Sequence, residues 1–264
     1  MHKNRLDRLN RLSEALQRGS VIRLREAAQI LGVSEMTVRR DVAACNGQLA
    51  YLGGYIVNGQ DPQGGLSYVL DWEKDSHAQS KQAACAVASS LIEEGDTVFI
   101  DCGTTTPHLA AHIPSGLHVT VVCYAMNVAE IIARNPNATL ILLGGLYHRS
   151  SASFAGEEAL ATLRRVGINK AFVSAGGIHA TRGVSCSNFH EVAIKRAAMA
   201  TAVHSYLVAD SSKFGKVKPA FFADLSQFEA VVTDPAIGAE QRVALETAGI
   251  ALLTAGRDRS AGQA

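Results

Sequence analysis

The chain has 264 residues, which suggests about two domains at roughly 150 residues each. Hydrophobic residues make up 47% and charged residues 19%, a globular balance with enough apolar material for a real core. No uncharged apolar run approaches the ~20 residues of a membrane span, and the N-terminus lacks the apolar region of a secretory signal. Five scattered cysteines without a CxxC pair predict reduced thiols and no zinc site. We therefore expect a cytoplasmic protein that needs no metal or other cofactor.

Charge is unevenly distributed, although the net charge of the whole chain is only +1. Residues 1–60 contain nine Lys or Arg against five acidic residues, net +4, whereas the remainder has 16 against 19, net −3. A small basic domain beside a mildly acidic one is typical of a polyanion-binding module joined to something else. A random fluctuation of surface charge would give the same numbers.

Helical periodicity occurs three times in the N-terminal segment. Leucines recur at helical spacing over residues 6–16, and leucines and alanines do so over 24–31, with Gly19 and Gly32 at the two ends. Ser34 is a good N-cap for a third helix, on which Val38 and Val42 lie one turn apart and are expected to pack inward. A helix, a glycine-containing turn and a helix with a polar outer face form the helix-turn-helix pattern.

The third helix carries the candidate DNA contacts. Residues near its start would reach base edges, and its two arginines could take phosphates or guanine edges. Two short β-prone runs around Gly53-Gly54 follow and predict a wing. The alternative is an ordinary solvated helix face. The candidate DNA-binding residues are Ser34, Glu35, Thr37, Arg39 and Arg40.

The remaining sequence predicts a linker followed by an α/β domain. Turn formers begin at Asn58, and a helix is expected over 76–94 with Ala83, Val87, Leu91 and Ile92 as its apolar positions. We expect a winged helix-turn-helix over 1–57, a linker over 58–75, a second domain over 76–256 and a disordered tail over 257–264.

Strand-like and helical runs alternate through the second domain. The strands are predicted at 97–100, 119–122, 140–143, 171–174, 206–209, 230–233 and 250–253, and helices at 128–133, 157–163, 192–202 and 240–247. This alternation predicts an open, mainly parallel sheet. Ligands bind such sheets at the carboxyl ends of the strands.

The run Asp101-Cys-Gly-Thr-Thr-Thr106 follows the first of these strands. Gly103 would let an anion approach the backbone, and three threonine hydroxyls with helix N–H groups could cradle it. The spacing lacks the Walker lysine, so a nucleoside triphosphate is not indicated. The alternative, with equal support from the sequence, is a run of threonines that caps the start of a helix.

Charged side chains recur in later loops of the same domain. Asp210 and Lys213 share one loop, where they could hold a phosphate or carbonyl at one end and a hydroxyl at the other, or form a plain polar turn. Glu191 and Lys195 have the i, i+4 spacing of a surface helix pair. Lys81 is most simply a solvated charge. Taken singly, these residues do not indicate a binding site; only their order along the chain does.

The run Ser34-Glu-Met-Thr-Val-Arg-Arg-Asp41 resembles the helix-turn-helix signature of the DeoR family of bacterial repressors. The order Lys81, Asp101-x-Gly-Thr-Thr-Thr, Gly144-Gly, Gly176-Gly, Glu191, Lys195, Asp210-Ser-Ser-Lys-Phe-Gly and Thr233-Asp234 resembles the sensor domain of that family. The resemblance runs from about Arg5 to Leu253. Its wing and the Val122-Cys-Tyr124 run are most similar to members that control deoxyribonucleoside operons.

The resemblance implies a ribose-5-phosphate isomerase-like sensor fold, double-stranded operator DNA as partner, a homo-oligomer and a phosphorylated pentose as effector, namely deoxyribose 5-phosphate. One departure lies at 42–55, where most members have a Leu-rich acidic stretch and a His-Gly-Gly wing; the recognition helix is expected to be shorter here. The implied ligand-binding residues are Lys81, Asp101, Gly103, Thr104, Thr105, Thr106, Asn127, Gly176, Glu191, Asp210 and Lys213.

The alternative function is a sugar-phosphate isomerase or deaminase with an accessory DNA-binding domain. Such an enzyme needs a carboxylate base beside the substrate carbon, for which Asp101, Glu191 or Asp210 could serve. However, Ala175 and Gly176 stand where an acid would be wanted. We therefore expect a regulator without catalytic activity.

Overall fold

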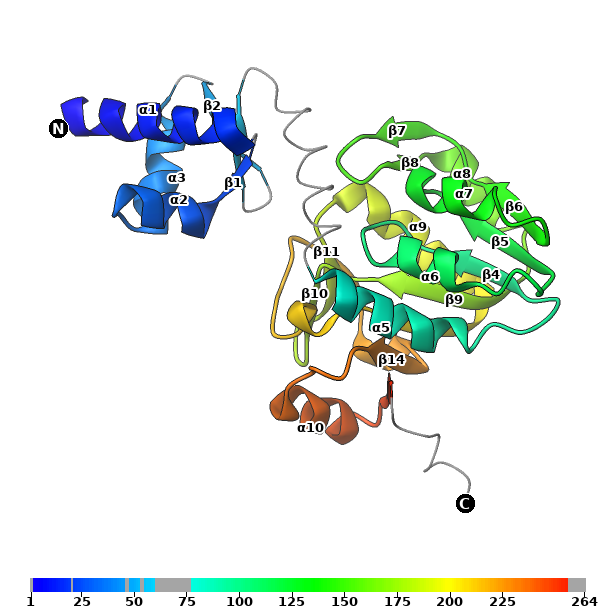
Figure 1. Ribbon diagram of the computed structural model, residues 1–264. Coiled ribbons are helices and arrows are strands. Elements are labelled where there is room, and N and C mark those ends of the chain that lie inside the picture. Colours follow the sequence, from blue (N-terminus) through cyan, green and yellow to red (C-terminus); the bar gives the residue numbers. More distant parts are fainter. Residues whose placement is uncertain (1, 20, 46–47, 53–54, 60–76, 256–264) are drawn as a thin grey trace. The chain divides into compact units, whose positions relative to one another are not determined.

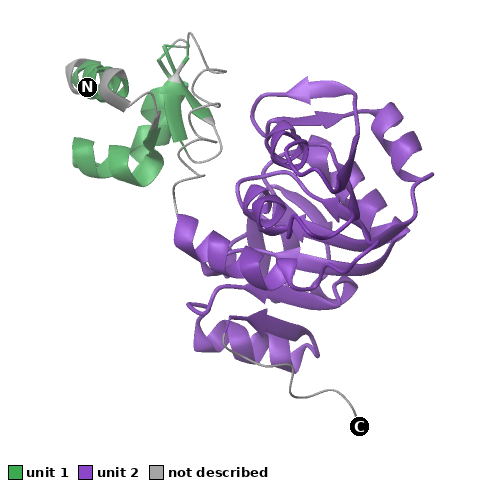
Figure 2. Ribbon diagram, turned by 45° about the vertical axis from the view of Figure 1, so that its right-hand side comes forward, with its two compact units in different colours: residues 1–73 green, residues 74–264 purple. Residues whose placement is uncertain are grey.

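The computed structural model describes residues 2–19, 21–45, 48–52, 55–59 and 77–255 (Figure 1). The chain divides into two compact units, residues 1–73 and 74–264 (Figure 2). Of the linker expected at 58–75, only residues 58 and 59 are described, and Asn58 belongs to a strand. The expected tail at 257–264 and the expected turn at Gly53-Gly54 lie outside the described residues.

The N-terminal unit is a winged helix-turn-helix. Gly32 ends the second helix with a left-handed φ of 66°, a conformation that suits glycine. Val38 and Val42 of the third helix are buried in a leucine-rich core, as their spacing predicted. The elements are α1 (His2–Gly19), β1 (Val21–Arg23), α2 (Leu24–Leu31), α3 (Glu35–Ala43), β2 (Leu49–Leu52) and β3 (Tyr55–Asn58).

The wing contains one strand more than the sequence predicted. β2 and β3 pair antiparallel, with Leu52 opposite Tyr55. β1 adds to the other side of β3, giving the order β1-β3-β2. Three residues are too short a run for alternation to reveal a strand.

The second unit is built on a seven-stranded parallel sheet in the order β15-β14-β12-β9-β4-β5-β6. All seven predicted strands are present in it, which confirms the open α/β fold. The strands are β4 (Thr97–Ile100), β5 (Val119–Cys123), β6 (Ala138–Leu142), β9 (Ile168–Ser174), β12 (Ala202–Val208), β14 (Ala230–Thr233) and β15 (Ala251–Thr254).

The strand order reverses direction next to β4. The chain first runs from β4 to β5 and β6, then returns to the other side of β4 with β9 and continues outward through β12. The loops after β4 and β9 therefore leave the sheet in opposite directions, and the crevice between them is where such sheets bind ligands. The topology thus selects the same loops that the sequence singled out.

Helices cover both faces of this sheet. In Figure 1, α5 (Ala78–Ser89), α6 (Thr106–His112) and α7 (Met126–Ile132) lie in front of the sheet, and α9 (Phe189–Thr201) lies behind it. α5 packs against α6 and β14, while α9 packs against β9 and β12. The two remaining helices are α8 (Glu157–Leu163) and α10 (Ala239–Thr247).

The prediction for α5 is wrong in two respects. The helix ends at Ser89 rather than at residue 94, so Leu91 and Ile92 are buried beyond its end. Its buried face also differs, because Ala83 and Val87 are only partly buried. The residues that face the core are Lys81, Ala84, Cys85 and Ala88.

The sequence pattern also failed to predict several short elements around the sheet. A two-stranded hairpin pairs β7 (Leu146–His148) with β8 (Ser153–Ala155). A small antiparallel sheet contains β10 (Gly177–His179), β11 (Gly183–Cys186) and β13 (Ala220–Ala223), and two 3-10 turns, η1 (Ser211–Lys213) and η2 (Leu225–Gln227), flank β13. These runs are too short and too rich in small residues to stand out as strands.

Candidate functional site

Asp101 is the centre of a buried hydrogen-bond network at the carboxyl edge of the sheet. Its side chain follows β4 and is 0% exposed. Tyr124, at the end of β5, donates a 2.7 Å hydrogen bond to Oδ1. Ser174, at the end of β9, donates to Oδ2 from its backbone N–H at 2.7 Å and from its hydroxyl at 2.8 Å. One carboxylate thus ties together three neighbouring strands.

Lys195 of α9 completes this network with a positive charge. Its ammonium donates to Asp101 Oδ2 and, at 3.3 Å, to the backbone oxygen of Ser174. Glu191, one turn earlier on α9, lies 3.7 Å away and accepts a 2.7 Å bond from Asn188. Burial lowers the pKa of Lys195, but Asp101 and the other anionic partners raise it well above its ordinary value. The surface-pair alternative for Glu191 and Lys195 is wrong, because both side chains are buried.

The threonine loop opens α6 at the end of β4. Gly103 has a φ of 116°, which an L side chain rarely adopts, and an added Cβ would lie 3.2 Å from the Ser174 hydroxyl. Thr105 is the N-cap residue of α6, but its hydroxyl makes no capping hydrogen bond. Thr104 is partly buried, whereas Thr105 and Thr106 are buried. The loop therefore brings three threonine hydroxyl groups to this edge of the sheet. The hydroxyl of Thr105 is not used to cap the helix.

Four buried polar atoms of the large unit lack a hydrogen-bond partner among the described residues. An unpaired buried polar atom costs about 1–3 kcal/mol, so such atoms are rare in folded proteins. All four follow strands at the same carboxyl edge, after β4, β5 and β12 or at the end of β14. They are Thr106 Oγ1, Asn127 Oδ1, Asp210 Oδ2 and Thr233 Oγ1.

Asn127 connects this set to the threonine loop. It lies on α7, after β5, and its amide nitrogen donates a 3.0 Å hydrogen bond to the backbone oxygen of Gly103. That bond fixes the orientation of the amide, so Oδ1 is left with an acceptor position open.

Asp210 lies after β12 and is fully buried. Its Oδ1 accepts a 3.0 Å bond from the backbone N–H of Ser212, so the carboxylate caps the turn η1 and leaves Oδ2 without a hydrogen bond. The Lys213 ammonium lies 4.0 Å from that Oδ2, and its side chain is 16% exposed. Asp234 supports the loop by accepting bonds from the backbone and side chain of Ser211 at 2.5 and 3.1 Å.

Lys81 of α5 is 0% exposed, so its interpretation as a solvated charge is wrong. Burial raises the pKa of the neighbouring Cys85 thiol to about 12. The Lys81 charge lowers this pKa, whereas the Asp210 charge raises it. Burial and the Lys81 charge also lower the pKa of His108 on α6. The Lys81 and Asp210 charges are therefore both close enough to Cys85 to act on its thiol.

The structure therefore gathers most of the predicted ligand residues at one edge. Gly176 contacts the small antiparallel sheet: its N–H donates to the backbone oxygen of Ser185 at 2.9 Å, and an added Cβ would lie 3.0 Å from Lys218. Residues absent from the predicted set also belong there, namely Tyr124, Ser174, Thr233 and Asp234. Each of them ends or directly follows a strand of the sheet, and closeness to a predicted strand end is the signal that the sequence offers.

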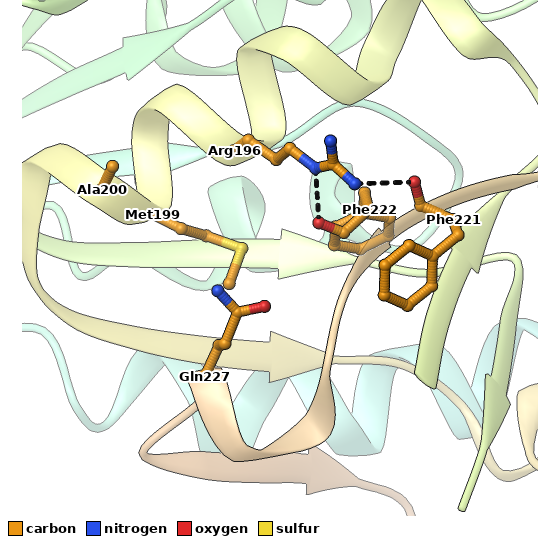
Figure 3. A pocket seen from close by; sticks show the side chains of 6 residues that line it. All are labelled: Arg196, Met199, Ala200, Phe221, Phe222 and Gln227. Carbon is orange, nitrogen blue, oxygen red and sulfur yellow. Dashed lines mark hydrogen bonds between the residues drawn. The ribbon is translucent and has the colours of Figure 1, made fainter. Parts of the chain in front are cut away.

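A groove of about 350 Å³ lies elsewhere, between α9, β13 and η2 (Figure 3). Arg196 crosses it and donates to the backbone oxygens of Phe222 and Phe221 at 2.9 and 3.3 Å. None of the predicted ligand residues lines it. Phe222, which lines the groove, also contacts the buried network, because the Lys195 ammonium lies 5.2 Å from the centre of its ring.

In the N-terminal unit, the predicted DNA contacts share the exposed side of α3. Glu35, Arg39 and Arg40 are exposed, and the Arg39 guanidinium lies 5.2 Å from the centre of the Tyr51 ring on β2. The Ser34 hydroxyl accepts a 3.2 Å bond from the backbone N–H of Thr37 and lies 2.9 Å from the Thr37 hydroxyl. Ser34 thus holds the start of the helix.

The inner side of α3 is anchored to α1. Asp41 is buried and pairs with the guanidinium of Arg8, whose Nη2 and Nε lie 2.6 and 2.7 Å from Oδ2. This pair fixes the recognition helix against the rest of the unit.

No helix among the described residues is long and apolar enough to cross a membrane.

Comparison with known proteins identifies both units. Residues 8–61 match the DeoR-like helix-turn-helix domain, and residues 76–235 match the DeoR C terminal sensor domain. Solved structures show only distant likeness. Ribose 5 phosphate isomerase A from Neisseria gonorrhoeae has a TM-score of 0.39 and 16% identity, over 52% of this chain and 53% of that one.

Relatives of known name cover nearly the whole chain. The deoxyribose operon repressor of Escherichia coli is 38% identical over 89% of this chain and 92% of its own length. The lactose phosphotransferase system repressor of Streptococcus mutans is 32% identical over 86% and 91%, and the regulator IolR of Bacillus subtilis is 31% identical over 87% and 91%. The chain belongs to the DeoR family of transcriptional repressors.

Proposed function

We propose that this repressor leaves its operator when a phosphorylated pentose, deoxyribose 5-phosphate, binds at the carboxyl edge of the sheet, and that it thereby controls genes of deoxyribonucleoside catabolism. The carrying observation is the set of four buried polar atoms without partners at that edge. A ligand rich in hydroxyl and phosphate oxygens would give them partners and remove an unfavourable desolvation cost.

The phosphate is assigned to the end of the site that contains the threonine loop. Gly103 allows the backbone to approach an anion, and the hydroxyls of Thr104, Thr105 and Thr106 can donate to phosphate oxygens. Lys81 and Lys213 supply positive charge close by, which a phosphate dianion requires when it leaves water.

The sugar hydroxyls are assigned to the acceptors. Asp210 Oδ2 and Asn127 Oδ1 can only accept hydrogen bonds, so they select donors such as hydroxyl groups. Glu191, held by Asn188, is a third acceptor nearby. Asp101 and Lys195 neutralise each other and position the surrounding strands. The deoxyribose part of the proposal is supported by the name of the Escherichia coli relative.

On the DNA side, Arg39 and Arg40 contact phosphates or guanine edges, and Glu35 and Thr37 face the bases beside them. The chain acts as a homo-oligomer, because paired recognition helices match symmetric half-sites. Release follows if the effector prefers the arrangement with poor DNA affinity. A differential affinity of about 1–3 kcal/mol per site changes occupancy about 5–150-fold.

Calorimetry tests the effector. The protein should bind deoxyribose 5-phosphate and not free deoxyribose, and equal affinity for both would contradict the phosphate site. A turnover assay with pentose phosphates tests the isomerase or deaminase alternative. Of the three candidate bases, Asp101 is disfavoured because its carboxylate is fully engaged by Tyr124, Ser174 and Lys195.

A further inference from the structure

Met36 is the most exposed large hydrophobic residue among the described residues of the N-terminal unit, with 71% of its surface accessible. A single exposed apolar side chain is ordinary and needs no explanation by itself. Leu6 on α1, for instance, is 63% exposed. The position of Met36 on the recognition helix is what distinguishes it.

Helical geometry places Met36 among the arginines. Residues three and four apart lie on one side of a helix, so Met36 shares its side with Arg39 and Arg40. Val38 and Val42 occupy the opposite side and are buried in the core. Helical side chains also lean toward the N-terminus, so Met36 covers the first turn of α3. In helix-turn-helix proteins this end of the recognition helix contacts base edges.

Few side chains in the first turn of α3 are candidates for contact with a base. Ser34 is engaged with the backbone and hydroxyl of Thr37, as the capping geometry requires. Arg39 lies against the Tyr51 ring on the wing. Met36 and Glu35 therefore remain as the exposed side chains of the first turn that point away from the core.

A thioether side chain has little to offer the polar groups of a base. It lacks a hydrogen-bond donor, and its sulfur is only a weak acceptor. The major groove presents one apolar group, the C5-methyl of thymine, which proteins read by apolar contact. We propose that Met36 is a specificity-determining residue that contacts a thymine methyl group in the operator. This inference rests on the proposed DNA-reading role of α3.

The test uses the full-length protein without effector. Its binding site is first selected from random-sequence duplex DNA, and each thymine is then replaced singly by deoxyuridine, which removes only the methyl group. At one thymine position, or at its counterpart in the symmetric half-site, this replacement should weaken binding by the wild type about fourfold. That loss corresponds to the transfer free energy of one buried methyl group. Met36→Ala should bind the thymine and deoxyuridine duplexes equally, because the contact is already gone.

Two variants complete the design. Met36→Leu keeps an apolar side chain and should retain part of the preference for thymine. Leu6→Ala, a change at an exposed apolar residue on α1, should leave the whole deoxyuridine profile unchanged. All three variants should unfold at the wild-type temperature, because both positions are exposed.

The outcomes separate this inference from the function on which it rests. Failure to enrich any sequence would contradict DNA reading itself. An enriched site whose deoxyuridine profile is the same for wild type and Met36→Ala would overturn only the role of Met36. If selection with Glu35→Ala relaxed a cytosine position while Met36→Ala left the deoxyuridine profile unchanged, the first turn would be assigned to Glu35 instead, because a carboxylate accepts from the cytosine amino group.

Discussion

Lys195 on α9 forms a buried ion pair with Asp101, a residue 94 positions earlier in the chain. The pair joins the helix behind the sheet to the loop at the end of β4. Because Ser174 and Tyr124 donate to the same carboxylate, Asp101 also joins β4 to its two neighbours. The proposed effector site is thus built around a buried charge pair.

Replacing Asp101 by Asn should destabilise the sensor unit by about 3–5 kcal/mol, the cost of leaving one member of a buried pair without its partner. Urea unfolding measures the effect. Glu240→Gln, at an exposed carboxylate on α10, should change stability little. If Asp101→Asn were as stable as Glu240→Gln, the pair would not have the role described.

Lys213→Met should abolish release by effector while operator binding stays intact, because the ammonium is needed only where the phosphate binds. An anisotropy titration on operator DNA measures both properties. Lys216→Met changes an exposed lysine of the same loop and should release normally. A Lys213→Met protein that still released normally would exclude Lys213 from the site. A borohydride-trapped adduct on Lys213 of the wild type would instead indicate a Schiff base.

Buried thiols predict an alkaline limit of stability. Burial raises the pKa of Cys85 and of Cys123 from 9.0 to about 12. The folded chain keeps these protons above pH 9, where the unfolded chain releases them. Their contribution to stability is therefore complete below pH 9 and is lost as pH rises toward 12.

Urea unfolding at pH 8 to 11 checks this linkage. Each thiol should contribute up to about 1.4 kcal/mol per pH unit to the decline above pH 9. The double variant Cys85→Ala, Cys123→Ala should start less stable, because two buried side chains are shortened, and should decline less steeply. Parallel declines for the two proteins would count against the linkage.

The wing positions Arg39. Tyr51→Ala should weaken operator binding about two- to fivefold, as expected for an exposed cation–π contact, whereas Tyr51→Phe keeps the ring and should bind normally. Arg39→Ala should lose more and, if the arginine contacts a phosphate, reduce the salt slope by about one. The double variant should bind like Arg39→Ala. Additive losses would mean that Tyr51 contacts DNA independently.

Much of the fold was predictable because the strands of the parallel sheet are short apolar runs that alternate with helices. The carboxyl-edge rule then brought together residues as distant as Asp101 and Asp210. The capping of α3 by Ser34 followed from local chemistry alone.

The sequence was less informative where tertiary burial overrides local pattern. Lys81 lies among alanines and a cysteine, so the local pattern predicts that the lysine faces solvent and that Val87 faces the core. In the sequence Tyr124 stands out only as part of the Val122-Cys-Tyr124 run, because a tyrosine after a strand does not reveal which distant carboxylate it meets. Only the folded chain shows that its hydroxyl reaches Asp101.

We propose that a phosphorylated pentose releases this repressor from DNA. Fluorescence anisotropy of the full-length protein on its selected operator, titrated in parallel with deoxyribose 5-phosphate, deoxyribose and inorganic phosphate, tests it most directly. We predict dissociation with the phosphate ester and unchanged anisotropy with the other two compounds. Stable binding in the presence of saturating deoxyribose 5-phosphate, or equal release by free deoxyribose, would contradict the account.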